Sequence, residues 1–349
     1  MKRLLVMRFS AMGDAAMTVP VLHALATQHP NLRITMLTRS RFVPMFEWLP
    51  ANVQVKGIDL KNYHGISGLT HLYRQLKPAK FDAVADLHNV LRTKYLRTCF
   101  SLAGTPVAVI NKGRQDKKAL IGHALDHDAL RPMPERYADV FRTLGFSITL
   151  PERMPINLKQ ESFVTIQQVT GIKQPNQYWI GIAPFAAHPQ KIYPLEHMQQ
   201  VVNTLADLGH RVFLFGAGKT ETSTLAQWVE SYDRNGRNPH HVVNISGVLD
   251  GLKNEMLLMS MLDVMLSMDS ANMHIASIVG IPVLSIWGAT HPKAGFFGYG
   301  QNTDHAMQLP LPCRPCSIYG KKPCQFGDLR CMNIAPEAIV EKTLQIISR

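Results

Sequence analysis

Short apolar stretches alternate with helical stretches along this chain, and the alternation runs twice. Short runs bounded by turn residues are typical of strands, and the longer segments between them have the apolar spacing of helices. The expected strands are Leu4–Arg8, Ile34–Thr38, Val53–Gly57, Ala83–Leu87, Val107–Ile110, Trp179–Ala183, Val212–Phe215, Val243–Ile245, Val264–Met268 and Val283–Trp287. Strands separated by helices form parallel sheets, so the pattern predicts an α/β fold with two doubly wound, Rossmann-like sheets.

A proline-rich passage from Pro151 to Pro175 separates the two rounds of alternation. Because 349 residues are many for one domain, two domains of ordinary size are expected. We predict a first domain over residues 1–160, a second over residues 175–332 and a terminal helix over residues 333–349. The two Rossmann-like domains are expected to face each other across a cleft.

Neither a secretory signal nor a membrane-spanning helix is indicated. Arg8 and Asp14 interrupt the first apolar stretch too early for a signal peptide. The longest apolar run, Ile275 to Ala289, is too short to cross a bilayer and contains Gly-Ile-Pro. The sequence therefore predicts a cytoplasmic protein.

The formal net charge of +12 lies almost wholly in the first half of the chain. Residues 1–150 contain 21 Lys and Arg against 10 Asp and Glu, whereas residues 151–349 contain 16 against 15. The asymmetry suggests that the first half meets a phosphorylated substrate, a membrane surface or nucleic acid. The alternative is a basic surface kept for solubility. No nucleic-acid-binding motif is recognisable, and aromatic residues make up only 8% of the chain.

The first expected strand leads into the turn "RFSAMGD", which ends on the carboxylate of Asp14. In doubly wound sheets, ligands bind beyond the carboxyl ends of strands, which is where Asp14 lies. The small residues Ala11 and Gly13 would let a substrate approach closely. Asp14 is therefore a candidate general base; the alternative is that it only caps the following helix.

Four segments come directly after strands of the second half and should open on the same cleft: "APFAAHPQK", "FGAGKTE", "SMDSANMH" and "IWGATHPKAGFFGYG". "FGAGKTE" is not a P-loop, because Phe213 stands where the first glycine is required. Its Glu221 could cap a helix or accept a ribose hydroxyl.

Two of these segments suggest an anion site. Asp269 or Ser270 could cap a helix whose N-terminal N–H groups suit a phosphate, with His274 about one turn further on. Lys191 precedes a Tyr-Pro turn and could neutralise a leaving diphosphate; the alternative is an ordinary surface lysine.

Four of the five cysteines cluster near the end of the chain: Cys313, Cys316, Cys324 and Cys331. Their number suits a structural zinc ion, but their spacing is irregular. Ordinary reduced thiols are the alternative.

These segments resemble the ADP-heptose:lipopolysaccharide heptosyltransferases of glycosyltransferase family 9, in order and over nearly the whole chain. "RFSAMGD" followed by "MTVPVLHAL" is similar to their opening. "KIYPLEHM" is similar to their Lys-x-Trp-Pro-x-x-x-[WF] segment, with Tyr193 in place of Trp. "MDSANMHIASIVGIPVLSIWGATHP" resembles their Asp-Thr-Gly-x-x-His-x-Ala stretch and the Gly-x-Pro segment after it, and "CRPCSIYGKKPCQFGDLRC" resembles a cysteine-bearing tail that many members have.

The resemblance implies a GT-B fold whose first domain binds the acceptor, whose second domain binds the nucleotide-sugar, and whose last helix returns to the first domain. It implies inverting heptose transfer from ADP-heptose to an anionic lipopolysaccharide inner-core glycolipid, without a metal or other cofactor and in peripheral contact with the inner membrane. By position, Asp14 and Lys191 would be catalytic. The donor-binding candidates are Lys191, Glu221, Asp269, Ser270, Ala271 and His274. The acceptor-binding candidates are Arg8, Ser10, Met12, Gly13, Arg92, Lys112 and Arg114.

Three alanines depart from the family pattern. Ala186 and Ala187 stand where hydroxyl residues are common, and Ala271 replaces a glycine. These departures leave the donor sugar open. The alternatives are a GT-B enzyme with another nucleotide-sugar, an epimerase, or a non-catalytic nucleotide-binding relative.

Overall fold

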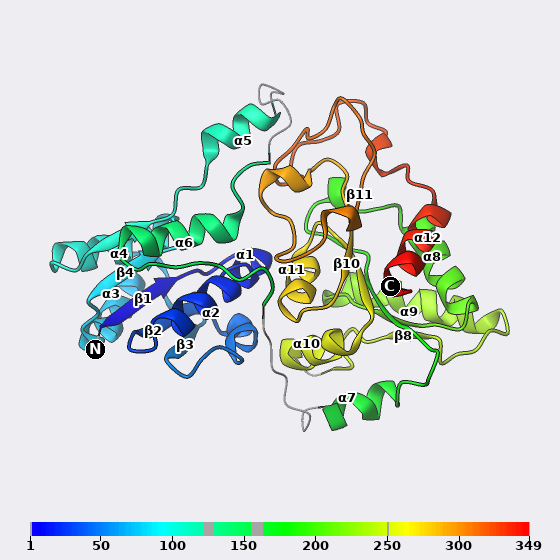
Figure 1. Cartoon of the computed structure of the whole chain (residues 1–349), viewed down its shortest axis with the longest axis horizontal. Coiled ribbons are helices and arrows are strands. Elements are labelled where there is room, and N and C mark those ends of the chain that lie inside the picture. Colours follow the sequence, from blue (N-terminus) through cyan, green and yellow to red (C-terminus); the bar gives the residue numbers. More distant parts are fainter. Residues whose placement is uncertain (1, 122–128, 155–162, 250, 349) are drawn as a thin grey trace. The chain divides into compact units, whose positions relative to one another are not determined.

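The computed structural model describes residues 2–121, 129–154, 163–249 and 251–348. The chain divides into two compact units (Figure 1). The first unit consists of Met1–Gly113 and Arg131–Glu152, and the second of Arg114–Leu130 and Arg153–Arg349. Each unit has its own parallel sheet with helices packed on it.

The sheet of the first unit has five strands in the order β3-β2-β1-β4-β5. The strands are β1 (Arg3–Met7), β2 (Arg33–Arg39), β3 (Val53–Ile58), β4 (Ala83–Asp86) and β5 (Val107–Val109). The α-helices are α1 (Met12–Ala16), α2 (Val19–Gln28), α3 (Gly65–Leu76), α4 (Leu91–Leu102) and α6 (Met133–Thr143). Leu5 and Met7 of β1 pack with Leu72 of α3 and Leu96 of α4 in the core.

The sheet of the second unit has six strands in the order β11-β10-β9-β6-β7-β8. The strands are β6 (Trp179–Ala183), β7 (Arg211–Leu214), β8 (Val242–Asn244), β9 (Val264–Met268), β10 (Val283–Ile286) and β11 (Ala306–Met307). The α-helices are α5 (Arg114–Ile121), α7 (Phe163–Thr170), α8 (Leu195–Asp207), α9 (Gly218–Arg234), α10 (Gly251–Met261), α11 (Ala271–Ile278) and α12 (Pro336–Ile347).

The predicted α/β fold with two doubly wound sheets is confirmed. All ten expected strands are present, with ends shifted by no more than a residue or two. The two-residue strand β11 was not foreseen, since so short a strand leaves no pattern in the sequence. Among the described residues, no helix is long and apolar enough to cross a bilayer.

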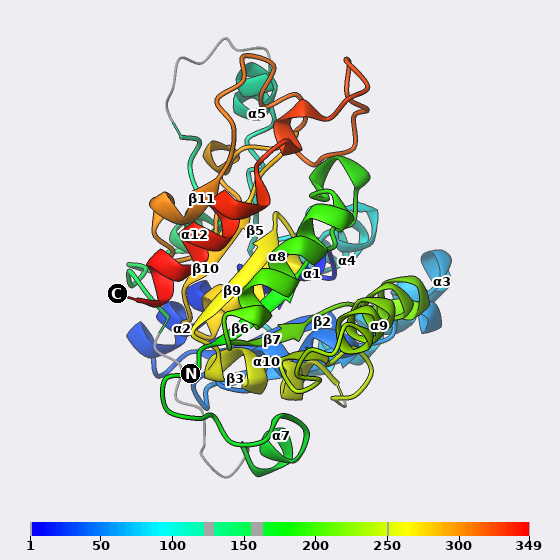
Figure 2. The ribbon, with the colours of Figure 1, turned by 90° about the vertical axis from the view of Figure 1, so that its right-hand side faces the viewer.

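The predicted domain bounds stay a prediction, and the two compact units divide the chain differently in two places. The segment Arg114–Leu130, expected in the first domain, belongs to the second unit, where Leu120 and Leu130 pack with Ala294 and Ile318. The terminal helix α12, expected on the first domain, packs on α8 and β9 of the second unit (Figure 2). Its Ile339, Val340 and Ile346 side chains are part of that unit's core because they form the apolar face of the helix.

Gly68 of α3 lies very close to another part of the backbone in the first unit, and a substitution can test this packing. A Cβ atom at Gly68 would lie 2.5 Å from the Tyr63 carbonyl carbon and 2.7 Å from its Cα atom. Helix propensity alone predicts that Gly68→Ala stabilises the protein by about 1 kcal/mol. Because the clash is with backbone, we expect the opposite sign, a loss of about 1–3 kcal/mol in the free energy of unfolding.

Urea denaturation measures this change in the free energy of unfolding. Ser67→Ala, at the exposed neighbouring position, is the control and should change stability by less than about 0.5 kcal/mol; a more stable Gly68→Ala protein would contradict the packing described.

Candidate active site

Each sheet reverses its direction of winding once, and the candidate residues of each unit lie at the reversal point of that unit's sheet. In the first unit the reversal lies between β1 and β4, and in the second between β6 and β9. At such a point, helices leave on opposite faces of the sheet and open a crevice beyond the carboxyl ends of the two strands. Asp14 follows β1, while Lys191 follows β6 and Asp269 follows β9.

The buried Arg8 guanidinium joins the two strand ends of the first unit. Met7, the last residue of β1, is in register with Asp86, the last residue of β4. Arg8 comes directly after Met7. Its Nη1 donates to the Leu87 carbonyl at 2.7 Å, and its Nη2 lies 2.7 Å from Oδ2 of Asp14. The carboxylate is therefore fixed by a charged group that is itself fixed to the neighbouring strand.

Only one oxygen of Asp14 is taken up by these contacts. Oδ2 also accepts a hydrogen bond from the Ala11 N–H at 3.1 Å, so the capping interpretation of Asp14 is correct as far as it goes. Among the described residues, Oδ1 has no hydrogen-bond partner, and the side chain is 24% exposed. A carboxylate held by one oxygen and open at the other can accept a proton from a bound hydroxyl group.

His88, beyond the end of β4, contacts the same turn and was not singled out from the sequence. Its Nε2 lies 3.1 Å from the Ser10 hydroxyl oxygen. The segment that carries it is fixed by the fully buried Asp86, whose Oδ1 accepts from the N–H groups of His88 and Asn89. Arg97 of α4 donates to the other oxygen of Asp86 at 2.9 Å.

Burial, and after it the nearby positive charges of Arg8 and Lys112, lower the pKa of His88 to about 3. The imidazole is therefore neutral at physiological pH, so one ring nitrogen donates and the other accepts. A neutral ring adds no charge beside the Arg8–Asp14 pair. The only sequence signal for His88 is that "DLHN" comes at the end of a strand.

The other acceptor-binding candidates are spread over both units. Met12 and Gly13 lie in the first turn of α1, beside Asp14, and Arg92 is exposed on α4. Lys112 donates to the Asn89 carbonyl at 3.3 Å, close to the His88 segment. Arg114 is the first residue of α5 and so belongs to the second unit; its role in acceptor binding stays a prediction.

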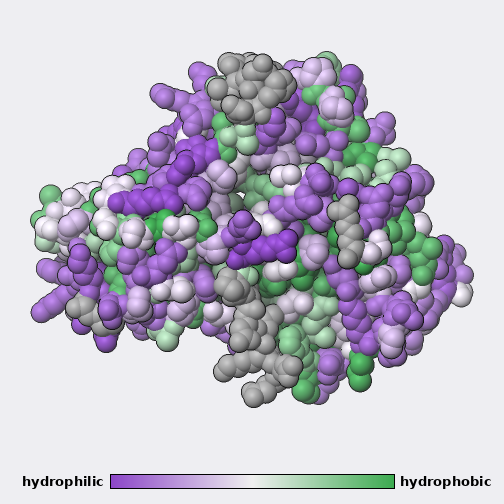
Figure 3. Space-filling model, in the orientation of Figure 1, coloured by the Kyte–Doolittle hydropathy of each residue, from purple (hydrophilic) through white to green (hydrophobic). Residues whose placement is uncertain are grey.

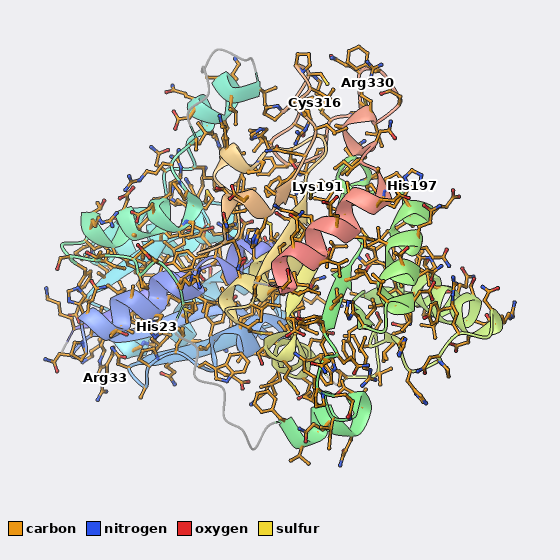
Figure 4. The ribbon with its side chains drawn as sticks, turned by 45° about the vertical axis from the view of Figure 1, so that its right-hand side comes forward. His23, Arg33, Lys191, His197, Cys316 and Arg330 are labelled. Atoms are coloured by element: carbon orange, nitrogen blue, oxygen red, sulfur yellow. The ribbon has the colours of Figure 1, made fainter. Side chains whose placement is uncertain are left out.

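In the second unit, Lys191 and Asp269 form a close ion pair at the reversal point. Nζ of Lys191 lies 2.7 Å from Oδ2 of Asp269 and donates to the Asp269 carbonyl at 3.0 Å. Only 15% of the lysine side chain is exposed, so the interpretation as an ordinary surface lysine is wrong. Figure 4 shows Lys191 below the loop that carries Cys316. An ammonium group has three donors, and two are used here.

The N-terminus of α11 lies directly after Asp269. Ser270 is its N-cap residue but makes no side-chain capping bond; its hydroxyl instead lies 3.1 Å from that of Ser267. The N–H groups of the first turn, beginning at Ala271, can therefore meet an anion. His274, one turn on, is buried, and its contact with a phosphate stays a prediction.

Glu221 lies at the carboxyl end of β7, in the first turns of α9. Its Oε2 accepts from the Ala217 N–H at 2.8 Å, so the helix-capping interpretation is confirmed. A contact of Glu221 with a ribose hydroxyl stays a prediction.

Arg314, which the sequence did not single out, anchors the cysteine-bearing loop beside β10. Its buried guanidinium donates to the carbonyl groups of Gly288 and Thr290, at 2.5 and 2.9 Å. The Cys316 and Ser317 N–H groups both donate to the Ala289 carbonyl, at 3.1 and 3.2 Å. The loop thus holds the strand end that borders the Lys191 site.

The four clustered cysteines do not come together as a set of metal ligands in the part of the chain that the structure describes. Among the described residues, which include all four, no three His, Cys, Asp or Glu side chains come together so that they could hold an ion. The structural-zinc prediction finds no support in this arrangement.

The chain is similar to curated and solved bacterial proteins. It is 23% identical to the lipopolysaccharide core heptosyltransferase OpsX of Haemophilus influenzae over 83% of this chain and 80% of that protein. It is 20% identical to lipopolysaccharide heptosyltransferase 1 of Pseudomonas aeruginosa, over 93% and 88%. The structure of E. coli ADP-heptose lipopolysaccharide heptosyltransferase II matches with a TM-score of 0.73 at 17% identity, covering 100% of this chain and 99% of that one. A glycosyltransferase family 9 structure from Veillonella parvula matches with a TM-score of 0.76 at 20% identity, over 99% and 97%.

The neutrality of His88 can be measured directly. In NMR spectra, we expect its imidazole signals to show no protonation as the pH falls well below 6.5, the value of an unperturbed histidine. The unfolded chain then binds a proton that the folded chain does not, so the His88 contribution to stability is lost as the pH falls from 6.5 toward 3. His88→Gln identifies the signals and should flatten that pH dependence. Titration near pH 6.5 would mean that the ring is exposed.

The assignment to a family rests on a family model that matches most of the chain. The model of glycosyltransferase family 9 (heptosyltransferase) matches residues 69–326, more than half of the sequence. The predicted GT-B class agrees with the heptosyltransferase structures that this fold matches from end to end. The chain is therefore a member of glycosyltransferase family 9, the heptosyltransferases.

Proposed function

We propose that this enzyme transfers a heptose from ADP-heptose to a lipopolysaccharide inner-core acceptor, with inversion and without a metal ion. The names of its relatives support this: OpsX is described as a lipopolysaccharide core heptosyltransferase. The E. coli heptosyltransferase WaaC, whose structure this chain matches with TM-scores of 0.67 and 0.65 at 18% and 17% identity, was crystallised with ADP and with ADP-2-deoxy-2-fluoro heptose.

The observation that carries the proposal is the half-anchored carboxylate of Asp14. One oxygen is fixed by Arg8 and by the Ala11 N–H, and the other has no hydrogen-bond partner among the described residues, on a side chain that is 24% exposed. An acceptor hydroxyl bound there would give its proton to Oδ1 while its oxygen attacks the anomeric carbon of the donor. Attack opposite to the leaving group inverts that carbon.

The bond that breaks joins the anomeric carbon to the diphosphate, which takes the electron pair. The second unit offers positive charge for it without a metal: the third donor of the Lys191 ammonium, and the free N–H groups of the first turn of α11. Ser270 and Ala271 begin that turn. Asp269 holds the lysine in place, and Glu221 is the candidate for the ribose.

The basic first unit would meet the acceptor, an anionic glycolipid, at the inner membrane. Ser10, Met12 and Gly13 adjoin Asp14, while Arg92 and Lys112 flank the His88 segment and offer charge to phosphate or carboxylate groups. The donor sugar is the least constrained part of the proposal, because Ala186 and Ala187 provide no hydroxyl groups and Ala271 replaces a glycine. Incubation with a panel of ADP-, UDP- and GDP-sugars tests it; preference for a donor other than ADP-heptose would replace this substrate with that one, and binding without turnover would favour a non-catalytic relative.

Asp14→Asn separates the catalytic role from the capping role. Asparagine caps helices about as well as aspartate, so a residue that only caps would leave turnover almost unchanged. If Asp14 is the base, turnover should fall about 10²- to 10⁴-fold. ADP affinity and melting temperature, measured on the same protein, should change little. Near-normal turnover of this variant would refute the catalytic assignment.

Lys191→Met should weaken ADP binding by about 1–3 kcal/mol, because a charge-assisted contact is lost and the Asp269 carboxylate then faces the diphosphate unneutralised. Calorimetry measures this. Lys173 provides a matched control: it pairs with Asp263 at 2.6 Å, at the amino end of β9, whereas Lys191 pairs with Asp269 at the carboxyl end. Lys173→Met should bind ADP as the parent does. Equal losses in the two variants would mean that Lys191 acts on stability alone.

A further inference from the structure

Every exposed large hydrophobic residue in the described part of the first unit lies on α3 or α4. Ile66 of α3 is 71% exposed, and Leu91 and Leu102 of α4 are 84% and 85% exposed. On the part of the first unit that carries these helices, Figure 3 shows apolar residues set among hydrophilic ones. Exposing such side chains to water costs free energy, which is regained when another surface covers them.

The two leucines lie on one face of α4. They are eleven residues apart, which is three helical turns or about 16 Å. Lys94 and Thr98, also exposed, lie between them on the same face, while Thr93, Leu96 and Phe100 are buried on the opposite face. The exposed side therefore carries a leucine at each end and a lysine between.

α3 continues this face beside the N-terminal half of α4. The Thr70 hydroxyl lies 2.6 Å from that of Tyr95, and it also donates to the Ile66 carbonyl at 2.8 Å. Thr70 is one turn beyond Ile66, and Tyr95 is one turn beyond Leu91. Since α3 and α4 both run back from the carboxyl edge of the same parallel sheet, Ile66 and Leu91 lie at the same end of the helix pair.

The sequence around this face contains no acidic residue. Neither residues 60–81 nor residues 87–113 include an Asp or Glu. The same two stretches contain eight basic residues: Lys61, Arg74, Lys77, Lys80, Arg92, Lys94, Arg97 and Lys112. Of these, Arg97 is paired with Asp86, whereas Arg92 and Lys94 are exposed beside Leu91.

We propose that this α3–α4 face (Ile66, Leu91, Arg92, Lys94 and Leu102) lies against an anionic lipid bilayer. Exposed leucines with lysine and arginine among them, and no acids, match the two attractions of such a surface: apolar insertion below the headgroups and charge neutralisation at them. Nucleic acid would use the charges but leave the leucines in water.

Docking of this face would place the membrane next to Asp14, the proposed general base. α4 begins just beyond the Asp86–Asn89 segment, at the sheet edge where Arg8 and Asp14 lie. A glycolipid anchored in the bilayer could then present its sugar at that edge without leaving the membrane. The inference rests on the proposed function only for this lipid-linked acceptor; the α3–α4 face itself is independent of donor and turnover.

Flotation of the full-length protein with vesicles tests the proposal. We expect binding to vesicles of equal parts phosphatidylglycerol and phosphatidylcholine, and little binding to phosphatidylcholine alone. The double variant Leu91→Ser/Leu102→Ser should bind at least about tenfold more weakly. Arg92→Gln/Lys94→Gln should lose about 30-fold, close to fivefold for each charge.

Leu208→Ser/Val248→Ser is the matched control, since both residues are exposed, at 53% and 56%, on the second unit. It should bind as the parent does. Equal binding by all variants, or no binding of the parent protein to the anionic vesicles, would overturn the proposal and point to a protein partner for this face. Transfer to a delipidated acceptor by Leu91→Ser/Leu102→Ser should match the parent, which keeps a failure of the docking surface distinct from a failure of the proposed reaction.

Discussion

The reversal of winding in each parallel sheet is the constraint on which both candidate sites depend. Successive helices cross on one face and then on the other, so the loops after two neighbouring strands diverge and leave polar backbone open beyond them. In the first unit these strands are β1 and β4, and in the second they are β6 and β9. A doubly wound sheet therefore has one place at its carboxyl edge that is open to a ligand, and each unit has one such place.

Each unit has an ion pair at this edge, and the two pairs present groups of opposite charge. In the first, the buried Arg8 cation holds the Asp14 carboxylate, which stays partly exposed. In the second, the buried Asp269 carboxylate holds the Lys191 ammonium. Taking ions from water is costly, and each pair offsets this with hydrogen bonds to backbone carbonyl groups, those of Leu87 and Asp269. One unit thus presents a partly exposed carboxylate and the other presents a cation, the two groups that the proposed glycosyl transfer would use.

The sequence predicted what depends on local pattern. Apolar runs located the strands, and the position of a polar residue after a strand was enough to single out Asp14, Lys191 and Asp269. The unit to which α5 belongs could not be predicted in this way. It depends on contacts far apart in the chain, such as Lys117 lying over the ring of Phe296 at 4.3 Å. The apolar face of α12 was visible too, but a helix pattern does not say which sheet the face covers. His88 was missed because a lone histidine after a strand has no distinctive spacing; its neutrality comes from burial beside Arg8.

The cysteines are the conspicuous residues of the cysteine-bearing loop, but the side chain that anchors this loop is an arginine. The four thiols suggested a metal, yet the loop is tied to the second unit through Arg314, whose guanidinium reaches the Gly288, Thr290 and Leu309 carbonyl groups. A planar group with five donors can satisfy several buried carbonyls at once, which no thiol can do. The loop also needs Gly320, where φ is +73° and a Cβ atom would lie 2.7 Å from Cγ of Lys191. The loop's glycine and arginine thus fix the space and the backbone around the Lys191–Asp269 pair, so this segment, distant in the sequence, shapes the carboxyl edge of the second sheet through packing.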